Sequence, residues 1–233
     1  MCRPPLPLKP SPAFQRLSAE RSTCSSSARH ASRNAGGNKT RKLDFCMADA
    51  LRQGADSIIT CGAVQSNHCR LTLAWAVKEG WTAPHSGRAG QGSYKPEASG
   101  NNFLFQLLGV KSISVVPGGS DMMGEMQKLA ETLRAEGKKP YVIPGGASNK
   151  IGALGYVSCA EEVLRQLFET GLRIEHMVVP SGSAGTHAAS LPGWIGNNAG
   201  IPVTGIGVNR KKKPNKPLCS NWHRKHSIIS EPA

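Results

Sequence analysis

The sequence predicts an α/β fold in which helices flank parallel strands. Short β-branched runs alternate with segments of helical periodicity through the middle of the chain, which is the rhythm of a parallel sheet. Small, polar loops follow several of these runs. The length of 233 residues allows one large or two small domains with a substantial core. Because ligands in such folds gather where strands end, the loops are the places to look for function.

The first expected elements lie between residues 44 and 79. A helix over 44–53 would place Phe45, Met47, Ala48 and Leu51 toward a core and end before a glycine. The β-branched run 57–61 suits a buried parallel strand. A second helix over 66–79 begins with a capping residue, Ser66, and is followed by a glycine.

The same alternation continues to residue 208. Strands are expected over 111–116, 141–143, 176–179 and 202–208, and helices over 122–136 and 152–169, with a short helix after Thr186. Gly171 is the expected stop of the helix over 152–169. The pattern defines an α/β region over 36–208, with a smaller domain at roughly 50–145. The flanking segments 1–35 and 209–233 lack periodic structure, and we expect 1–35 to be poorly ordered.

The positive charge is concentrated in these two ends. The net charge of the chain is +14. Residues 1–43 have nine Lys/Arg and one acidic residue, 201–233 have seven and one, and 44–200 have thirteen of each sign. The central region is therefore electrostatically ordinary. Basic ends of this kind bind polyanions without specificity, so a non-catalytic basic protein remains a second class of function, while no specific nucleic-acid partner is expected.

Composition also bears on the cellular compartment. The seven cysteines are odd in number and irregularly spaced, and they form neither a C-x-x-C nor a zinc pattern, so no metal site is expected. No apolar run approaches the roughly 18 residues that span a bilayer. Five prolines lie in the first twelve residues, where a signal peptide would have an apolar helix. We therefore expect a cytoplasmic protein without a membrane partner.

The run 36–42, Gly-Gly-Asn-Lys-Thr-Arg-Lys, has the composition of a site for lysine chemistry. A neutral lysine amine forms a Schiff base with an aldehyde, and nearby cations or burial lower its pKa toward that state. Lys39 has Arg41 and Lys42 beside it, and the glycines permit close approach of a flat cofactor. The alternative is a glycine-rich turn followed by a basic first helical turn.

Two further loops point to the same cofactor. Gln65 to His68 follows a strand at a helix start, and Ser181 to Thr186 connects a strand to a helix through small residues and hydroxyls. Free backbone N–H groups at such a helix start form a phosphate cradle. The second loop fits neither a P-loop nor a dinucleotide fingerprint. A Schiff-base lysine, a phosphate cradle and polar groups at a helix start together indicate pyridoxal phosphate.

Four motifs in this order resemble the family of pyridoxal-phosphate enzymes that contains D-cysteine desulfhydrase and 1-aminocyclopropane-1-carboxylate (ACC) deaminase. They are Gly-Gly-Asn-Lys-Thr-Arg-Lys-Leu at 36–43, Gln-Ser-Asn-His-Cys-Arg at 65–70, Tyr-Val-Ile-Pro-Gly-Gly-Ala-Ser-Asn at 141–149 and Ser-Gly-Ser-Ala-Gly-Thr-His-Ala at 181–188. The resemblance implies a tryptophan-synthase-β-like fold (fold type II), with a larger cofactor domain and a smaller α/β domain, and a homodimer.

The resemblance also implies roles for individual residues. Lys39 matches the lysine that forms the Schiff base with the cofactor, and Lys42 one that helps to hold the phosphate. Ser66 matches the serine that acts on the substrate, and Asn67 an asparagine near the ring oxygen of the cofactor. Four residues match the phosphate loop, namely Ser183, Ala184, Gly185 and Thr186.

The activity that these motifs favour is breakdown of a small amino acid. His68 and the loops at 145–149 and 181–187 are more similar to the desulfhydrase side of the family. D-cysteine desulfhydrase, which releases pyruvate, sulfide and ammonia, is therefore expected first. ACC deaminase, which releases α-ketobutyrate and ammonia, is second, and an activity like that of L-cysteate sulfo-lyase is third. An inactive, truncated family member with a basic tail is the remaining alternative.

Several segments depart from the family pattern. The C-terminal part that supplies residues facing the pyridine nitrogen is missing, the stretch 82–88 has no strand character where a strand is expected, and the helix after Thr186 meets Pro192. Blocks that resemble the family thus alternate with blocks of foreign composition. We hypothesise that 1–35, 81–92 and 209–233 are partly out-of-frame translation, which resequencing of the gene would test.

Overall fold

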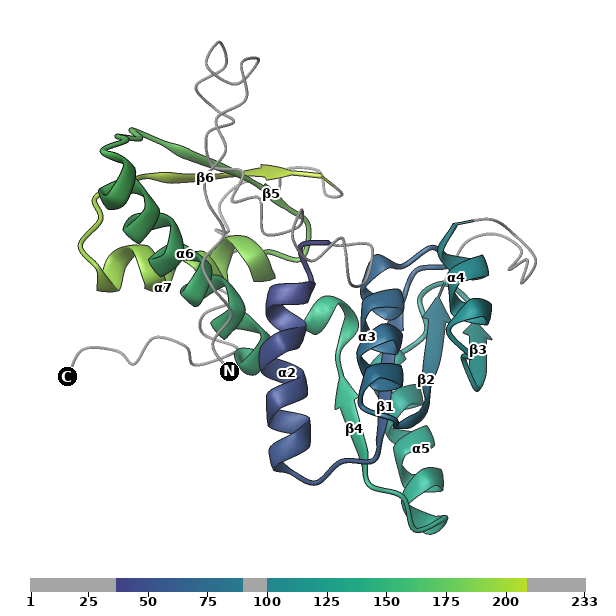
Figure 1. Cartoon of the computed structure of the whole chain (residues 1–233). Coiled ribbons are helices and arrows are strands. Elements are labelled where there is room, and N and C mark those ends of the chain that lie inside the picture. Colours follow the sequence, from purple (N-terminus) through teal and green to yellow (C-terminus); the bar gives the residue numbers. More distant parts are fainter. Residues whose placement is uncertain (1–36, 90–99, 209–233) are drawn as a thin grey trace, which may run out of the picture. The chain divides into compact units, whose positions relative to one another are not determined.

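The computed structural model of the chain describes residues 37–89 and 100–208, and these fall into two compact units (Figure 1). The four-stranded unit comprises residues 43–147, and the two-stranded unit comprises 37–42 together with 148–208. Of the three segments in the frame-shift hypothesis, 1–35 and 209–233 lie outside the described residues, and 81–92 is described only as far as residue 89. None of the described helices has the length and apolar character needed to span a bilayer.

The four-stranded unit is built on a parallel sheet with the strand order β3-β2-β1-β4. Its strands are β1 (Ser57–Gly62), β2 (Thr82–Ala89), β3 (Ser112–Val116) and β4 (Pro140–Ile143). Its helices are α2 (Thr40–Arg52, whose first three residues belong to the other unit), α3 (Asn67–Lys78), α4 (Asn101–Leu107) and α5 (Met122–Ala135), with a 3-10 turn η2 at Gly145–Ala147. The α/β class with parallel strands is confirmed.

Strand β2 corrects the expectation that 82–88 has no strand character. The strand lies between β1 and β3 and pairs with both in parallel. Ser57 pairs with Thr82 but Ile59 pairs with His85, so β2 has one extra residue opposite β1. Pro84 lies in this bulge, where a residue without an N–H is tolerated. Backbone pairing on two sides therefore outweighs the weak strand propensity of the segment.

Helix α2 also differs from the expectation in the face that it buries. Its buried residues are Leu43, Cys46, Met47 and Ala50, whereas Phe45, Ala48 and Leu51 are exposed. The buried set has the i, i+3, i+4, i+7 spacing of a helical stripe. The stripe is centred one position away from the expected one because small residues, a cysteine and an alanine, form half of it.

The two-stranded unit contains β5 (Met177–Ser181) and β6 (Val203–Gly207), which pair in parallel from Met177 opposite Val203 to Ser181 opposite Gly207. Two helices, α6 (Lys150–Thr170) and α7 (Gly185–Gly196), pack with the strands around a buried cluster. That cluster consists of Cys159, Ala160, Val163, Leu167, Met177 and Trp194. Helix α6 ends as the sequence predicts, with Gly171 in the left-handed conformation at φ 65°.

Helix α7 continues through Pro192, at which the sequence departs from the family pattern. A proline inside a helix removes one hydrogen bond and crowds the preceding turn. The apolar face of α7 offsets this cost, because Ala188, Ala189 and Trp194 are all buried on either side of the proline. Packing of that face therefore decides the length of the helix, as tertiary contacts do for most helices in proteins.

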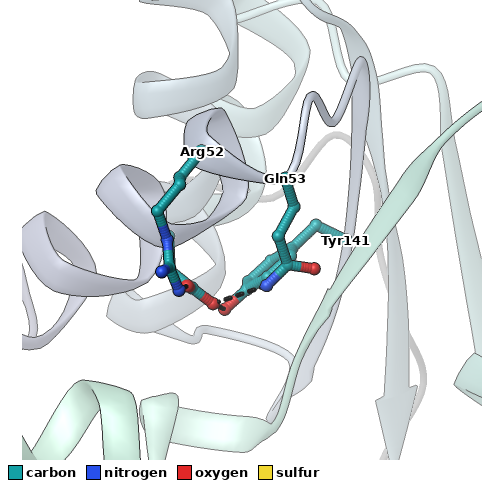
Figure 2. Close-up of polar contacts among 4 residues, drawn as sticks. Arg52, Gln53 and Tyr141 are labelled. Atoms are coloured by element: carbon teal, nitrogen blue, oxygen red, sulfur yellow. Dashed lines mark hydrogen bonds and ion pairs between the residues drawn. The ribbon is translucent and has the colours of Figure 1, made fainter.

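A cluster of polar groups joins α2 to β4 in the four-stranded unit (Figure 2). Tyr141 Oη donates to Asp49 Oδ2 at 2.7 Å, Arg52 donates to Asp49 Oδ1 at 2.6 Å, and Gln53 donates to Asp49 Oδ2 at 2.8 Å. The hydrogen bond from Arg52, followed by that from Tyr141, lowers the pKa of Asp49 below its ordinary value of 3.8. The carboxylate is therefore the common acceptor that ties the end of α2 to the sheet.

Replacing Tyr141 by phenylalanine is expected to lower the free energy of unfolding by about 1 to 2 kcal/mol, because it removes a hydrogen bond to a charged acceptor. The folded-state pKa of Asp49 lies below the unfolded one, so its contribution is complete above pH 3.8 and declines as the pH falls further. Denaturant unfolding at pH 7 and pH 3 measures both effects. A Tyr141→Phe penalty that stays constant over this range would contradict the role of the Asp49 carboxylate.

Candidate functional site

The start of α2 carries both lysines of the predicted site, and both lie in the two-stranded unit. Lys39 immediately precedes the helix and is half-buried. Lys42, one turn on, is only 1% exposed and is the largest fully buried side chain among the described residues. A buried ammonium group needs an anion or strong acceptors around it, and at this position Lys42 could contribute positive charge to an anion-binding site.

A glycine of α6 allows the start of α2 to pack closely against that helix. A methyl group on Gly155 would stand 2.5 Å from the carbonyl carbon of Arg41 and 2.8 Å from the backbone nitrogen of Lys42. Beside this contact the Arg41 guanidinium forms an ion pair with Glu162 of α6 at 2.8 Å. The backbone of the two lysines is therefore held against α6 by close packing and by a largely buried ion pair.

The loop between β5 and α7 lies beside Lys42 at the start of a helix. Strand β5 ends at Ser181, and α7 begins at Gly185 after Ala184, which takes the left-handed conformation at φ 65°. Ala184 makes no side-chain capping bond, and the N–H of Gly185 donates to Ser183 Oγ at a long 3.5 Å, so the backbone N–H groups and the helix dipole here favour negative charge. A methyl group on Gly185 would stand 3.3 Å from Lys42 Nζ and 2.5 Å from Ser148 Oγ. The absent side chain thus lets Ser148 and the Lys42 ammonium approach the start of α7 closely.

The pKa of Lys39 is lowered from its ordinary value of 10.5 because burial disfavours the charged amine. This differs in cause from the sequence-based expectation, which attributed the shift chiefly to neighbouring cations. The charge of Arg41 is compensated by Glu162. Burial nevertheless acts in the direction that a Schiff-base lysine requires, because it enlarges the fraction of nucleophilic neutral amine.

Tyr156 of α6 links the two halves of this site and was not singled out from the sequence. Its hydroxyl donates to the backbone carbonyl of Asn38 at 3.2 Å and accepts from the hydroxyl of Thr186. Burial raises its pKa to about 12, so the group stays protonated as a donor. A tyrosine one residue after a helix glycine is a weak sequence signal, since such a ring serves equally well as core packing.

Ser66 and Asn67 lie in the four-stranded unit, at the start of α3. Ser66 is the N-cap, as the sequence predicts, and its Oγ accepts from the backbone N–H of Cys69 at 3.2 Å. A methyl group on Gly62 would lie 2.7 Å from Ser66 Cβ, so the end of β1 passes directly beneath the serine. Asn67 is exposed. The serine hydroxyl has an acceptor role in the cap and keeps its own proton to donate.

His68 anchors the same helix start to the sheet. Thr60 Oγ1 donates its one hydrogen to the carbonyl of Ile143 at 2.9 Å, so it must accept from His68 Nε2–H at 2.8 Å. All three residues are buried. The imidazole thus fixes α3 to β1 and, through the threonine, to β4. This bond fixes the position of the start of α3, which includes Ser66 and Asn67, relative to the end of β1.

The structure distributes the predicted residues over the two units as follows. The two-stranded unit brings together Lys39, Lys42 and the loop 183–186. The four-stranded unit holds Ser66 and Asn67 at the carboxyl end of β1. In the two-stranded unit, a buried cation, an uncapped helix start and a lysine of lowered pKa form a site that can hold a phosphate next to a nucleophilic amine.

Comparison with protein families gives a match over nearly the whole chain. A family model described as pyridoxal-phosphate dependent enzyme matches residues 13–231. D-cysteine desulfhydrase of Yersinia enterocolitica is 41% identical over 184 residues, which are 78% of this chain and 55% of that protein. The desulfhydrase of Salmonella typhi is 41% identical and matches 78% of this chain and 56% of its own length. The chain spans about half the length of the curated relatives it matches.

Solved structures agree with these relatives. A structure described as an ACC deaminase homologue aligns with a TM-score of 0.70 and 33% identity, covering 86% of this chain and 61% of that one. Threonine deaminase from T.th. aligns with a TM-score of 0.52 at 16% identity, covering 72% and 49%, and supports the fold alone. The fold is that of the fold type II enzymes. By sequence and by structure, the chain belongs to the family of pyridoxal-phosphate dependent enzymes.

Proposed function

We propose that this chain acts in the pyridoxal-phosphate dependent breakdown of D-cysteine, in which D-cysteine and water yield pyruvate, sulfide and ammonia. The observation that carries the proposal is the buried ammonium of Lys42 beside the uncapped start of α7, next to a lysine whose pKa is lowered by burial. The choice of substrate is supported by the relatives at 41% identity, which are D-cysteine desulfhydrases.

The residues present fit the phosphate of the cofactor. Lys42 would supply the compensating cation, and the backbone N–H groups of Ser183, Ala184, Gly185 and Thr186 would bind the phosphate oxygens. A phosphate there would be attracted by the buried ammonium. Thr40, next to Lys39, has a buried hydroxyl for which the described part of the chain provides no hydrogen-bond partner. A bound ligand would provide one.

When bound, pyridoxal phosphate supplies an aldehyde for amine attachment and a ring that withdraws electrons from the substrate. Lys39 would hold the cofactor through its amine and, once displaced by the amine of the substrate, would take up or return a proton at Nζ. Its lowered pKa supports both roles, because the neutral amine is the form that attacks and accepts a proton.

Two residues of the four-stranded unit would act on the bound molecules. Ser66 would be the group that moves a proton or attacks at the substrate, since its hydroxyl accepts from Cys69 N–H and can donate its own hydrogen. Asn67 would bind the ring oxygen of the cofactor through its side-chain amide. Their placement at the carboxyl end of a parallel strand supports both assignments.

Replacing Gly185 by alanine is expected to raise the Kd for pyridoxal phosphate by about tenfold or more, because an added methyl group costs on the order of 1–3 kcal/mol in a tightly packed site. The group would lie 2.5 Å from Ser148 Oγ and 3.3 Å from Lys42 Nζ. Gly182→Ala in the same loop is the matched control, since its methyl group meets only Val208 Cγ2 at an ordinary 3.6 Å. Fluorescence titration measures the Kd for pyridoxal phosphate of both variants. Equal affinities for the two variants would contradict the cradle.

A product assay on the full chain tests the substrate. We expect sulfide and pyruvate from D-cysteine and neither from L-cysteine. The second candidate is ACC deaminase, which is favoured by the aligned homologue structure and would release α-ketobutyrate from ACC. Sulfite released from L-cysteate would indicate the third candidate, an activity like that of L-cysteate sulfo-lyase. A chain that binds the cofactor but yields none of these products would overturn the proposed activity and leave an inactive family member.

We also propose that the protein is a cytoplasmic homodimer. Four cysteines, Cys46, Cys61, Cys69 and Cys159, are free and buried, as expected in a reducing compartment. Large apolar side chains such as Phe168, 89% exposed on α6, offer surface for a second copy. Sedimentation velocity tests the dimer, and a single monomer species at micromolar concentration would contradict it. Retention of DNA at low salt with steep release by added salt would instead favour the basic non-catalytic alternative.

A further inference from the structure

Asn101 lies at the centre of a hydrogen-bond network that holds the loop before α3. It is the first residue of α4 and lies more than thirty positions from each of its partners in the sequence. Its Oδ1 accepts from Arg70 Nε at 2.8 Å, and its Nδ2 donates to the carbonyl of Gln65 at 2.9 Å and to Asn67 Oδ1 at 2.8 Å. The two N–H bonds and the oxygen of its side-chain amide are therefore all used.

The chemistry of Arg70 fixes the orientation of the whole network. A guanidinium group can only donate, so the atom of Asn101 that faces Arg70 must be the oxygen. The amino group of Asn101 then faces Gln65 and Asn67. The carbonyl of Gln65 is an acceptor by nature, which agrees with this assignment. The atom of Asn67 opposite the same amino group must likewise be its oxygen. The assignment follows from donors and acceptors alone.

A second pair of contacts keeps Asn101 in register with the loop. Its backbone N–H donates to Gln65 Oε1 at 2.9 Å, while its side chain donates to the Gln65 backbone, so the two residues bind each other reciprocally. Gly100 precedes it with φ +74°, and a methyl group there would lie 3.0 Å from Gln65 Oε1. The loop and the start of α4 are thus fixed to each other by main-chain as well as side-chain groups.

We propose that Asn101 is a positioning residue that sets which end of the Asn67 side-chain amide faces the cofactor. Because the oxygen of Asn67 is turned toward Asn101, its amino group is turned away and is presented as a donor from an exposed side chain. A donor is what the anionic ring oxygen of pyridoxal phosphate requires. The assignment of the network stands on the contacts themselves, while the identity of the acceptor rests on the proposed function.

The variant Asn101→Asp inverts this arrangement with almost no change in shape. A carboxylate still accepts from Arg70, but it places an oxygen where the amino group stood, so the hydrogen bond to the Gln65 carbonyl is lost and an oxygen faces Asn67. The amide of Asn67 is then expected to turn over, give its amino group to the carboxylate and present its oxygen to the cofactor. We expect the Kd for pyridoxal phosphate to rise about ten- to a hundredfold, the value of a hydrogen bond to a charged acceptor.

A spectroscopic signature separates this role from a merely structural one. A donor on the ring oxygen stabilises its anionic form, so loss of the donor makes the oxygen more basic. The pH at which the visible band of the bound cofactor changes is expected to move upward in Asn101→Asp. Gln106→Glu is the matched control, because it makes the same amide-to-acid change at an exposed position of the same helix.

A double-mutant cycle with Asn67→Ala tests whether the effect passes through Asn67. Asn101→Asp is expected to change the Kd and the titration of the visible band in the parent chain, and to add little in the Asn67→Ala background. The same fold-change in both backgrounds, or no change in either, would overturn the inference. Should Asn101→Asp fail to fold in a thermal melt, Asn101→Ala replaces it, with a smaller rise in Kd that again disappears in the Asn67→Ala background.

The cofactor-free chain gives an independent readout. In Asn101→Asp the Asn67 amino group gains a carboxylate partner, so hydrogen exchange of its side-chain protons is expected to slow relative to the parent and to Gln106→Glu. Unchanged exchange would overturn the orientation argued here. If the parent chain binds no cofactor but Asn101→Asp still slows exchange of the Asn67 side-chain protons, the proposed function would be overturned. The orientation of the Asn67 amide would remain supported.

Discussion

Replacing Lys39 by alanine is expected to abolish the visible absorbance of bound pyridoxal phosphate and to lower kcat by at least roughly 10²–10⁴-fold, the contribution typical of a positioned proton-transfer group. The side chain would be lost both as the point of attachment and as the base. Burial lowers the pKa of the Lys39 amine, which enlarges the fraction of the neutral, nucleophilic form. The absorbance spectrum and product assays on the purified variant measure the two effects.

Lys150→Ala is the control for this experiment. Lys150 is the first residue of α6, in the same unit, and its side chain is exposed. We expect it to match the parent in spectrum and in rate. Retention of the visible band by Lys39→Ala together with parent-like turnover would show that another group holds the cofactor, and would contradict the assignment of Lys39.

Gly155→Ala is expected to lower the free energy of unfolding by about 3 kcal/mol, the upper part of the range for overpacking. The added methyl group would lie 2.5 Å from the carbonyl carbon of Arg41 and 2.8 Å from the nitrogen of Lys42. These are backbone atoms that cannot rotate away, so α2 and α6 must separate. The same displacement would shift Lys42 relative to the start of α7, so cofactor affinity should fall together with stability.

Gly196→Ala is the matched glycine substitution for comparison. Gly196 ends α7, and an added methyl group there would have no neighbour within 4 Å. Its stability should be unchanged or higher by up to about 1 kcal/mol, the helix propensity of alanine over glycine. Denaturant unfolding of both variants gives the comparison. A Gly155→Ala protein as stable as Gly196→Ala would show that the close contact between α2 and α6 is not required.

Sequence patterns were sufficient for the elements that have strong local signals. The β-branched run 57–61 became β1, the cap at Ser66 begins α3, and Gly171 ends α6 with a positive φ. In each case one local feature, β-branching, a capping oxygen or a glycine, determines the backbone. The strand–loop–helix arrangement around 181–186 could be predicted for the same reason, since its parts are contiguous in the sequence.

Elements fixed by tertiary contacts could not be predicted. Strand β2 exists because two neighbouring strands pair with it, and α7 passes Pro192 because its apolar face is buried. The contacts around the site have the same origin. Tyr156 joins Asn38 to Thr186, and Asn101 joins Arg70 to Asn67, across separations of thirty residues or more. Patterns of local periodicity do not report such pairings.

The most direct test of the central claim is to map where the cofactor attaches. The full chain is incubated with pyridoxal phosphate, reduced with borohydride to make any lysine linkage permanent, digested and sequenced by mass spectrometry. We expect the modification on Lys39 and not on Lys42, three residues away, because burial lowers the pKa of Lys39, while Lys42 Nζ lies beside Gly185 in the proposed phosphate loop. Modification confined to exposed lysines such as Lys150, or none at all, would contradict the account.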